Sequence, residues 1–431
     1  MRFHLGLFAA LTLPLLFVCA AAAPCLADAG SDLKSGQDLM KAGKYDDAIV
    51  LFSAVVKTAD PTLAPKGQLC IGIALQEKKS YAESITALKI GIQTYPNAER
   101  VRREMLYRLG EVYGITGDNA GAIETYQSIA AQYPADSANA DLRLAHVFFE
   151  MKKYPEAIAL LKIRIAAHPD AGNTLMELSF LLGQCYRENG DLKSAVDIYQ
   201  SLGTQYPAKA DRAFLELGIC LQLQEQYADA QDAFQKSVDT GNGASNEARL
   251  RIDEVLRSEK KYQEEIAYLD KLYAEAPELR ADALTRQAEV MSVCLAGMSD
   301  VKSAIEKLQQ VIEEFPGSPL AVEAQARIAG IQVNNLKEFA TAESGLRHFM
   351  VKYPDYPALI VVAHDLAFCS YFQKNYTTAA ALFIDATKLK EIGNYIPVCL
   401  YMAADCYMRT RDYRNAKFYF DRLISKYPAE S

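Results

Sequence analysis

The stretch that decides the fold runs from residue 103 to residue 134 and reads REMLYRLGEVYGITGDNAGAIETYQSIAAQYP. Small and apolar side chains recur along it at helical spacing twice, and a Gly-Asp pair separates the two series. The first face consists of Leu106, Leu109, Gly110 and Tyr113, and the second of Ala122, Ile123, Tyr126 and Ile129. We expect two antiparallel helices that cross at Gly110 and Ala122, where a larger side chain would overpack the contact.

The small residue of the second helix recurs along the whole chain at intervals of about 35 to 39 residues, a period typical of helical solenoids. This position holds Ala48, Ser84, Ala122, Ala157, Ala195, Ala230, Ala304, Ala342, Ala379 and Ala416. Four residues after each comes a larger side chain, namely Phe52, Leu88, Tyr126, Leu161, Tyr199, Phe234, Leu308, Leu346, Phe383 and Phe420. The sequence therefore predicts an all-α repeat protein with one continuous core.

Two units share the pattern L-G-x-x-Y, then G-x-x-x-x-A-x-x-x-Y, then Y-P. The matching residues are Leu109, Gly110, Tyr113, Gly117, Ala122, Tyr126 and Pro134, and again Leu182, Gly183, Tyr186, Gly190, Ala195, Tyr199 and Pro207. The pattern resembles the tetratricopeptide repeat family, in particular its exported members. The resemblance implies an all-α, right-handed superhelical solenoid of about eleven helix-turn-helix repeats over residues 31 to 428. In the seventh unit Asp253 and Glu265 occupy the two small positions, which leaves its register open.

Residues 1–29 have the features of a secretory signal peptide. Arg2 is followed by an almost wholly apolar run from Leu5 to Val18, and Ala27-Asp28-Ala29 is a cleavage site of the A-x-A type. We expect cleavage after Ala29 and an exported protein, periplasmic or elsewhere in the cell envelope. The alternative is an uncleaved membrane anchor, because the apolar run is nearly long enough to span a bilayer.

The remaining chain is expected to form two arrays, 30–240 with repeats 1 to 6 and 246–428 with repeats 7 to 11. Between them lies Gly241-Asn242-Gly243-Ala244-Ser245, which is either a hinge that divides the array or a longer loop in a continuous one. The chain given stops directly after its last Tyr-Pro pair. The final helix, residues 413 to 426, is therefore expected to have an uncovered face that invites a partner or a second copy.

The net charge indicates which partners to expect, and the positions of the cysteines indicate whether disulfides form. The formal charge of −8 argues against nucleic acid, whose phosphates require a basic surface. Five cysteines lie two residues after the first-helix small position of their repeats, where cysteine serves as a small hydrophobe: Cys185, Cys220, Cys294, Cys369 and Cys406. We expect buried, reduced thiols there, since equivalent positions in neighbouring repeats are too far apart for a disulfide.

Motifs for catalysis, metals or cofactors are missing from the sequence. It contains no H-E-x-x-H and no G-x-S-x-G, and its glycine-rich stretch 114–121 lacks the lysine of a phosphate loop. We therefore expect a noncatalytic protein without cofactor or metal.

The family resemblance places one set of first-helix residues on a concave groove. They are Tyr107, Glu111, His146, Phe149, Phe180, Gln184, Arg187, Ile219, Gln222, His364, Phe368, Phe372, Tyr401, Asp405 and Met408. The aromatic members either bind a partner or pack within a tight superhelix. The expected function is a scaffold or adaptor for protein or peptide partners in the bacterial envelope, for example in outer-membrane or envelope assembly. A cell-wall glycan or small-ligand binder, and an enzyme with an unfamiliar site, remain the alternatives.

Overall fold

The computed structural model describes residues 29–295 and 297–428, and all regular structure within these ranges is helical. The α-helices are α1 (Ala29–Lys41), α2 (Tyr45–Lys57), α3 (Ala64–Glu77), α4 (Tyr81–Thr94), α5 (Glu99–Thr116), α6 (Asn119–Gln132), α7 (Ser137–Glu150), α8 (Tyr154–Ala167), α9 (Asn173–Glu188), α10 (Leu192–Gln205), α11 (Ala210–Leu223), α12 (Tyr227–Asp239), α13 (Ser245–Ser258), α14 (Tyr262–Glu275), α15 (Arg280–Glu289), α16 (Met298–Glu314), α17 (Pro319–Ile331), α18 (Phe339–Lys352), α19 (Leu359–Phe372), α20 (Tyr376–Ala386), α21 (Tyr395–Arg409) and α22 (Tyr413–Lys426). Three short 3₁₀ helices, η1 (Pro134–Asp136), η2 (Pro207–Lys209) and η3 (Pro277–Leu279), and two π-helices, η4 (Val290–Leu295) and η5 (Gln332–Leu336), join them. The all-α prediction is confirmed.

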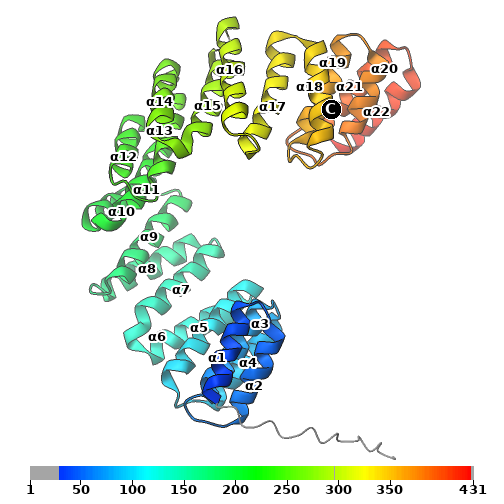
Figure 1. The fold of residues 1–431 in the computed structure, drawn as a ribbon. Helices are drawn as coiled ribbons and strands as arrows, with labels where there is room; N and C mark the ends of the chain where they lie inside the picture. Colours follow the sequence, from blue (N-terminus) through cyan, green and yellow to red (C-terminus); the bar gives the residue numbers. More distant parts are fainter. Residues whose placement is uncertain (1–28, 296, 429–431) are drawn as a thin grey trace, which may run out of the picture. The chain divides into compact units, whose positions relative to one another are not determined.

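Successive helices pair as the sequence predicts, so that the described chain forms eleven helix-turn-helix repeats from α1/α2 to α21/α22. Within α1 to α9, and again within α11 to α22, each helix packs against the next one (Figure 1). The chain divides into two compact units between Ile198 and Tyr199, inside α10.

The segment 241–245 consists of loop residues after α12 and the first residue of α13. The Ala244 N–H donates to Asp211 Oδ2 at 3.1 Å, and the Ser245 hydroxyl donates to the Ser237 carbonyl at 3.3 Å. These bonds fasten the segment to α11 and α12 and favour the longer-loop interpretation. The arrays 30–240 and 246–428 stay a prediction.

The helix crossings explain the small residues. Ala122 is fully buried, as are its counterparts in the other repeats that carry a small residue there. A Cβ added to Gly110 would lie 2.7 Å from Tyr126 Cζ, and one added to Gly218 would lie 2.5 Å from the Phe234 ring. The first-helix glycine therefore makes room for the large side chain sixteen residues later.

The turn between the two helices of a repeat contains one residue in the left-handed region. Gly117 has φ 78°, and Asp118 caps α6 by accepting from the Gly121 N–H at 3.0 Å. The same place is taken by other glycines or by long polar residues: Gly43, Lys79, Lys152, Gly190, Glu225, Lys260, Lys337, Lys374 and Arg411. In repeat 8 the first helix continues into η4.

Repeat 7 replaces its small residues with a buried ionic cluster. The side chains of Asp253 on α13 and Glu265 on α14 are 0% exposed. Arg257 Nε donates to Glu265 Oε1 at 2.8 Å, and Arg286 from α15 donates to Asp253 Oδ2 at 2.6 Å. Both acidic residues therefore lie at the crossing, which settles the register that the sequence left open.

The seven cysteines of the described ranges are free thiols. Cys185, Cys220, Cys369 and Cys406 are fully buried, as predicted. The prediction is wrong for Cys294, which is only partly buried. Its position lies in η4, and a π-turn adds one residue to the helix, which rotates the following side chains off the apolar face.

The predicted signal peptide lies outside the described residues up to position 28. Within residues 29–295 and 297–428, none of the helices combines the length and the apolarity that a bilayer span requires.

Candidate functional site

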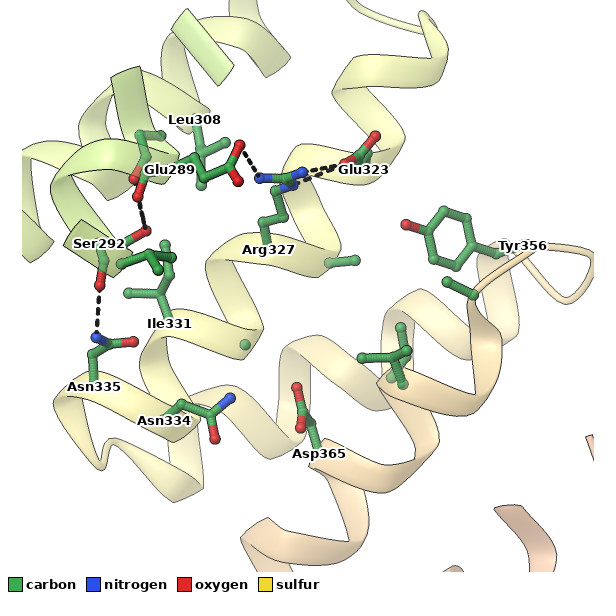
Figure 2. Close-up of a pocket in the computed structure, with 17 residues that line it drawn as sticks. Glu289, Ser292, Leu308, Glu323, Arg327, Ile331, Asn334, Asn335, Tyr356 and Asp365 are labelled. Atoms are coloured by element: carbon green, nitrogen blue, oxygen red, sulfur yellow. Dashed lines mark hydrogen bonds and ion pairs between the residues drawn. The ribbon is translucent and has the colours of Figure 1, made fainter. Parts of the chain in front are cut away.

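The first helices of repeats 8 to 10 surround a cavity of about 410 Å³ (Figure 2). Its walls come from α15 with η4, α17 with η5, and the start of α19. This volume falls within the range of about 300 to 1,000 Å³ that is usual for ligand pockets. We refer to it as the repeat 8–10 pocket.

Two π-helices shape the pocket. A π-turn bonds residue i to i+5 and is frequent at functional sites, where it redirects side chains. Here η4 directs Ser292 and η5 directs Asn334 and Asn335 to the cavity wall. The Asn335 amide donates to the Ser292 carbonyl at 3.1 Å, which joins the two π-helices across neighbouring repeats.

An ion-pair network forms one end of the pocket. Arg327 on α17 lies 2.8 Å from Glu323 and 3.8 Å from Glu289 on α15 (Figure 2). Glu289 also lies 3.3 Å from Arg257, so the pocket is connected to the buried cluster of repeat 7.

At the other end stands Asp365 of α19. Asp365 is only 8% exposed to solvent, and its Oδ1 lies 3.1 Å from Nδ1 of His364. Gly330 of α17 faces it, because a Cβ at Gly330 would lie 3.4 Å from Asp365 Oδ2. Figure 2 shows Asp365 and Asn334 on facing elements, away from the Arg327–Glu323 pair.

The remaining wall is apolar. It includes Ile331, Val361, Val362 and the ring of Tyr356, whose pKa is raised by burial of the phenol. Within the described ranges, no three His, Cys, Asp or Glu side chains are grouped so that they could hold a metal ion. The pocket is suited to binding a ligand that has both an apolar and a polar part.

Three predicted groove residues of the first unit come together. Tyr107, Glu111 and His146 line a cavity of about 490 Å³ between α5 and α7. Glu111 lies 3.2 Å from Arg108 and 3.6 Å from Arg143, so its charge is compensated. Burial raises the pKa of Tyr107 to about 12, and the phenol therefore stays protonated.

The other predicted groove residues of repeats 4 to 6 have different surroundings. Phe180 is 2% exposed and belongs to the core, which corrects its assignment to the groove. Phe149 is partly buried and packs edge to face on Tyr154, with ring centroids 5.5 Å apart. Arg187 lies 3.2 Å from Glu188, and Ile219 is half-buried on α11.

In the second unit the predicted aromatic residues form a row along α19. His364 lies 4.6 Å from Phe368, and Phe368 lies 5.6 Å from Phe372, between ring centroids. Phe372 is 48% exposed and stacks on Phe339 of α18 at 4.9 Å. Tyr401 on α21 is separate, half-exposed, and packs on Phe420 at 5.8 Å.

A family model described as tetratricopeptide repeat matches residues 104–136, 177–208, 282–318 and 398–429. The chain is a tetratricopeptide-repeat protein. The third match contains α15, η4 and α16, so the repeat that bears the first π-helix is itself one of the matched tetratricopeptide repeats.

Several solved structures are similar to this tetratricopeptide-repeat chain at low sequence identity. The C-terminal part of a TPR repeat-containing protein from Cytophaga hutchinsonii is 15% identical, with a TM-score of 0.40, over 68% of this chain and 98% of that one. MamA is 23% identical, with a TM-score of 0.33, over 40% and 94% of the two chains. The complex of the TPR2AB domain of yeast Sti1 with pHSP90 gives 20% identity and a TM-score of 0.26, over 66% and 97%. No curated protein matches the chain.

Proposed function

We propose that this tetratricopeptide-repeat chain is a noncatalytic scaffold or adaptor that binds protein or peptide partners in the bacterial cell envelope, in outer-membrane or envelope assembly. The family match to tetratricopeptide repeats supports a role in protein interaction. The signal-like residues 1–29 support an exported location.

The observation that carries the proposal is the repeat 8–10 pocket. Three consecutive first helices contribute to it, and its wall combines apolar side chains with the amide of Asn334 and the charged groups of Arg327 and Asp365. A peptide that lies across several repeats would contact these apolar, amide and charged groups one after another, because each repeat supplies one first helix. A few polar groups at fixed places then orient the bound chain.

The proposal is tested by site-specific photocrosslinking in the native envelope. A photoreactive residue at Val293 or Asn334, both exposed at the pocket, is expected to crosslink to one defined partner. The control is the same residue at Ile163, which is 64% exposed on α8, a second helix. Equal crosslinking from Ile163 and from the pocket positions would contradict this use of the pocket.

A glycan ligand is the second candidate, and the exposed ring of Phe372 favours it. Next to this ring the Gln373 amide donates to Glu343 Oε2 at 2.8 Å, which places aromatic, amide and carboxylate groups together as sugar binding requires. Phe372→Ala is then expected to abolish sedimentation with isolated cell walls. Unchanged sedimentation of this variant would exclude the stacking platform.

A further inference from the structure

We propose that the repeat 8–10 pocket receives the basic side chain of a lysine or arginine from the bound peptide, with Asp365 as its counter-ion. This inference rests on the proposed function, since it specifies the chemistry of the peptide that the scaffold binds. It is carried by the charge balance of the pocket, the position of Asp365 and the apolar wall.

Negative charge is in excess around the pocket. The network that joins it to repeat 7 contains more carboxyl groups than guanidinium groups. The carboxyl groups of the network belong to Glu247, Asp253, Glu254, Glu265, Glu289 and Glu323, and the guanidinium groups to Arg251, Arg257, Arg286 and Arg327. An anionic peptide group would be repelled here, because Arg327 is already paired with two carboxylates.

Asp365 is the carboxylate that this network leaves outside. It is nine-tenths buried on α19, at the end of the pocket opposite Arg327, and its described partner is the neighbouring imidazole of His364 (Figure 2). A carboxylate held in so little water is stabilised when a cation reaches it. The absent side chain at Gly330 keeps the approach to Oδ2 open.

The wall beside Asp365 is suited to the stem of such a side chain. Ile331, Val361 and Val362 line the same cavity as Asp365. Lysine and arginine bury their methylene chains along apolar surfaces while the charged head finds a polar group. The amide oxygen of Asn334, on the facing π-helix, is a second acceptor for that head.

The test uses the full chain and an immobilised library of random peptides. Wild-type protein is expected to enrich peptides in which one lysine or arginine is flanked by apolar residues. For the best such peptide, Asp365→Asn is expected to weaken the Kd at least tenfold, and replacing the peptide's basic residue by norleucine is expected to cause a similar loss. Combining both changes should add little, because each removes the same ion pair.

Asp385→Asn on the adjacent helix α20, where the carboxylate is exposed, is the matched control and should bind as wild type does. The norleucine peptide tests the same contact without altering the protein, so a folding defect in Asp365→Asn does not obscure the result. Two results together would overturn the inference and leave the proposed function standing. The captured peptides would show no preference for a basic residue, and the pocket-filling variant Gly330→Phe would no longer bind them. A chain that captures no peptide would overturn both.

Discussion

At the scale of single residues, glycine controls how closely the helices approach. Gly110→Ala on α5 would bring a Cβ to 2.7 Å from Tyr126 Cζ, so we expect a destabilisation of about 1 to 3 kcal/mol. Gly114→Ala on the same helix meets open space and should be neutral or stabilising by about 0.5 to 1 kcal/mol. Thermal melts followed by circular dichroism measure both. Equal melting midpoints for the two variants would contradict the crossing geometry.

Thiol reactivity should follow burial rather than repeat phase. Burial raises the pKa of Cys369 and of Cys406 to about 12, so we expect neither thiol to react until the protein unfolds. Cys70 and Cys294 are partly exposed and should be alkylated first in the native protein. Mass spectrometry after brief iodoacetamide treatment gives the order. Native-state labelling of Cys369 ahead of Cys294 would refute it.

At the scale of helices and turns, several repeats carry strain at the left-handed turn residue. Lys152 has φ 57°, a conformation that costs a non-glycine residue about 1 to 2 kcal/mol. Lys152→Gly should therefore stabilise the protein by about 1 kcal/mol in urea unfolding. Lys153→Gly is the control, since Lys153 has φ −86° and gains nothing from glycine. Stabilisation by both substitutions, or by neither, would contradict the strain argument.

The buried carboxyl pair of repeat 7 makes the stability of that element depend on pH. The pKa of Glu265 is raised to about 7, because burial and the neighbouring Asp253 raise it more than Arg257 lowers it. The folded pKa thus exceeds the ordinary value of 4.5, so the stabilisation is fully present below pH 4.5 and is lost as the pH rises through about 7. We expect the urea midpoint to fall between pH 4.5 and pH 7.

Other groups face the pair: Arg286 and Glu289 from α15, Cys294 from η4 and Tyr262 from α14. These stay in place in Glu265→Gln, which should flatten the pH dependence because its amide does not titrate. Glu264→Gln, at the exposed neighbouring position, should keep the slope of the wild type. Identical slopes in both variants would show that Glu265 is not the titrating group.

Spacing along the sequence determines the helix pairs but not the pocket. The small residues at Ala122 and its counterparts predict the crossing in each repeat except the seventh, because close packing favours small side chains there. A π-turn leaves the twelve-residue spacing from Ser292 to Ala304 intact, so this spacing gives no sign of η4. The sequence signal that points to the pocket is the pair Asn334-Asn335 directly before a turn.

The predicted groove residues also show what the phase of a repeat does not determine. Tyr107, Glu111 and His146 share the predicted phase on first helices of adjacent repeats and line one cavity, while their place on a concave groove stays a prediction. Phase alone does not separate groove from core for Phe180, because burial depends on the neighbouring repeat. Asp365 directly follows His364 in the sequence, so a prediction based on the helix face of His364 does not include it.

At the scale of the whole molecule, the candidate partner contacts lie in both compact units. Phe149 and Arg187 belong to the first unit, and the repeat 8–10 pocket belongs to the second. A long partner that engages both would gain affinity through the covalent link between them. The contribution of each unit to partner binding can then be tested by substitutions in the intact chain.

Phe149→Ala with Arg187→Ala is expected to abolish capture of the partner that photocrosslinking identifies, because binding energy concentrates in aromatic and arginine anchors. The melting midpoint should change little, since neither side chain lies at a helix crossing and Phe149 packs on Tyr154 at the start of α8. Pull-down at matched concentration and a circular dichroism melt measure the two effects. A double variant that melts several degrees lower and still captures the partner at normal affinity would show that these side chains are structural. Partner binding would then depend on the second unit, where Asp365 and Asn334 stand.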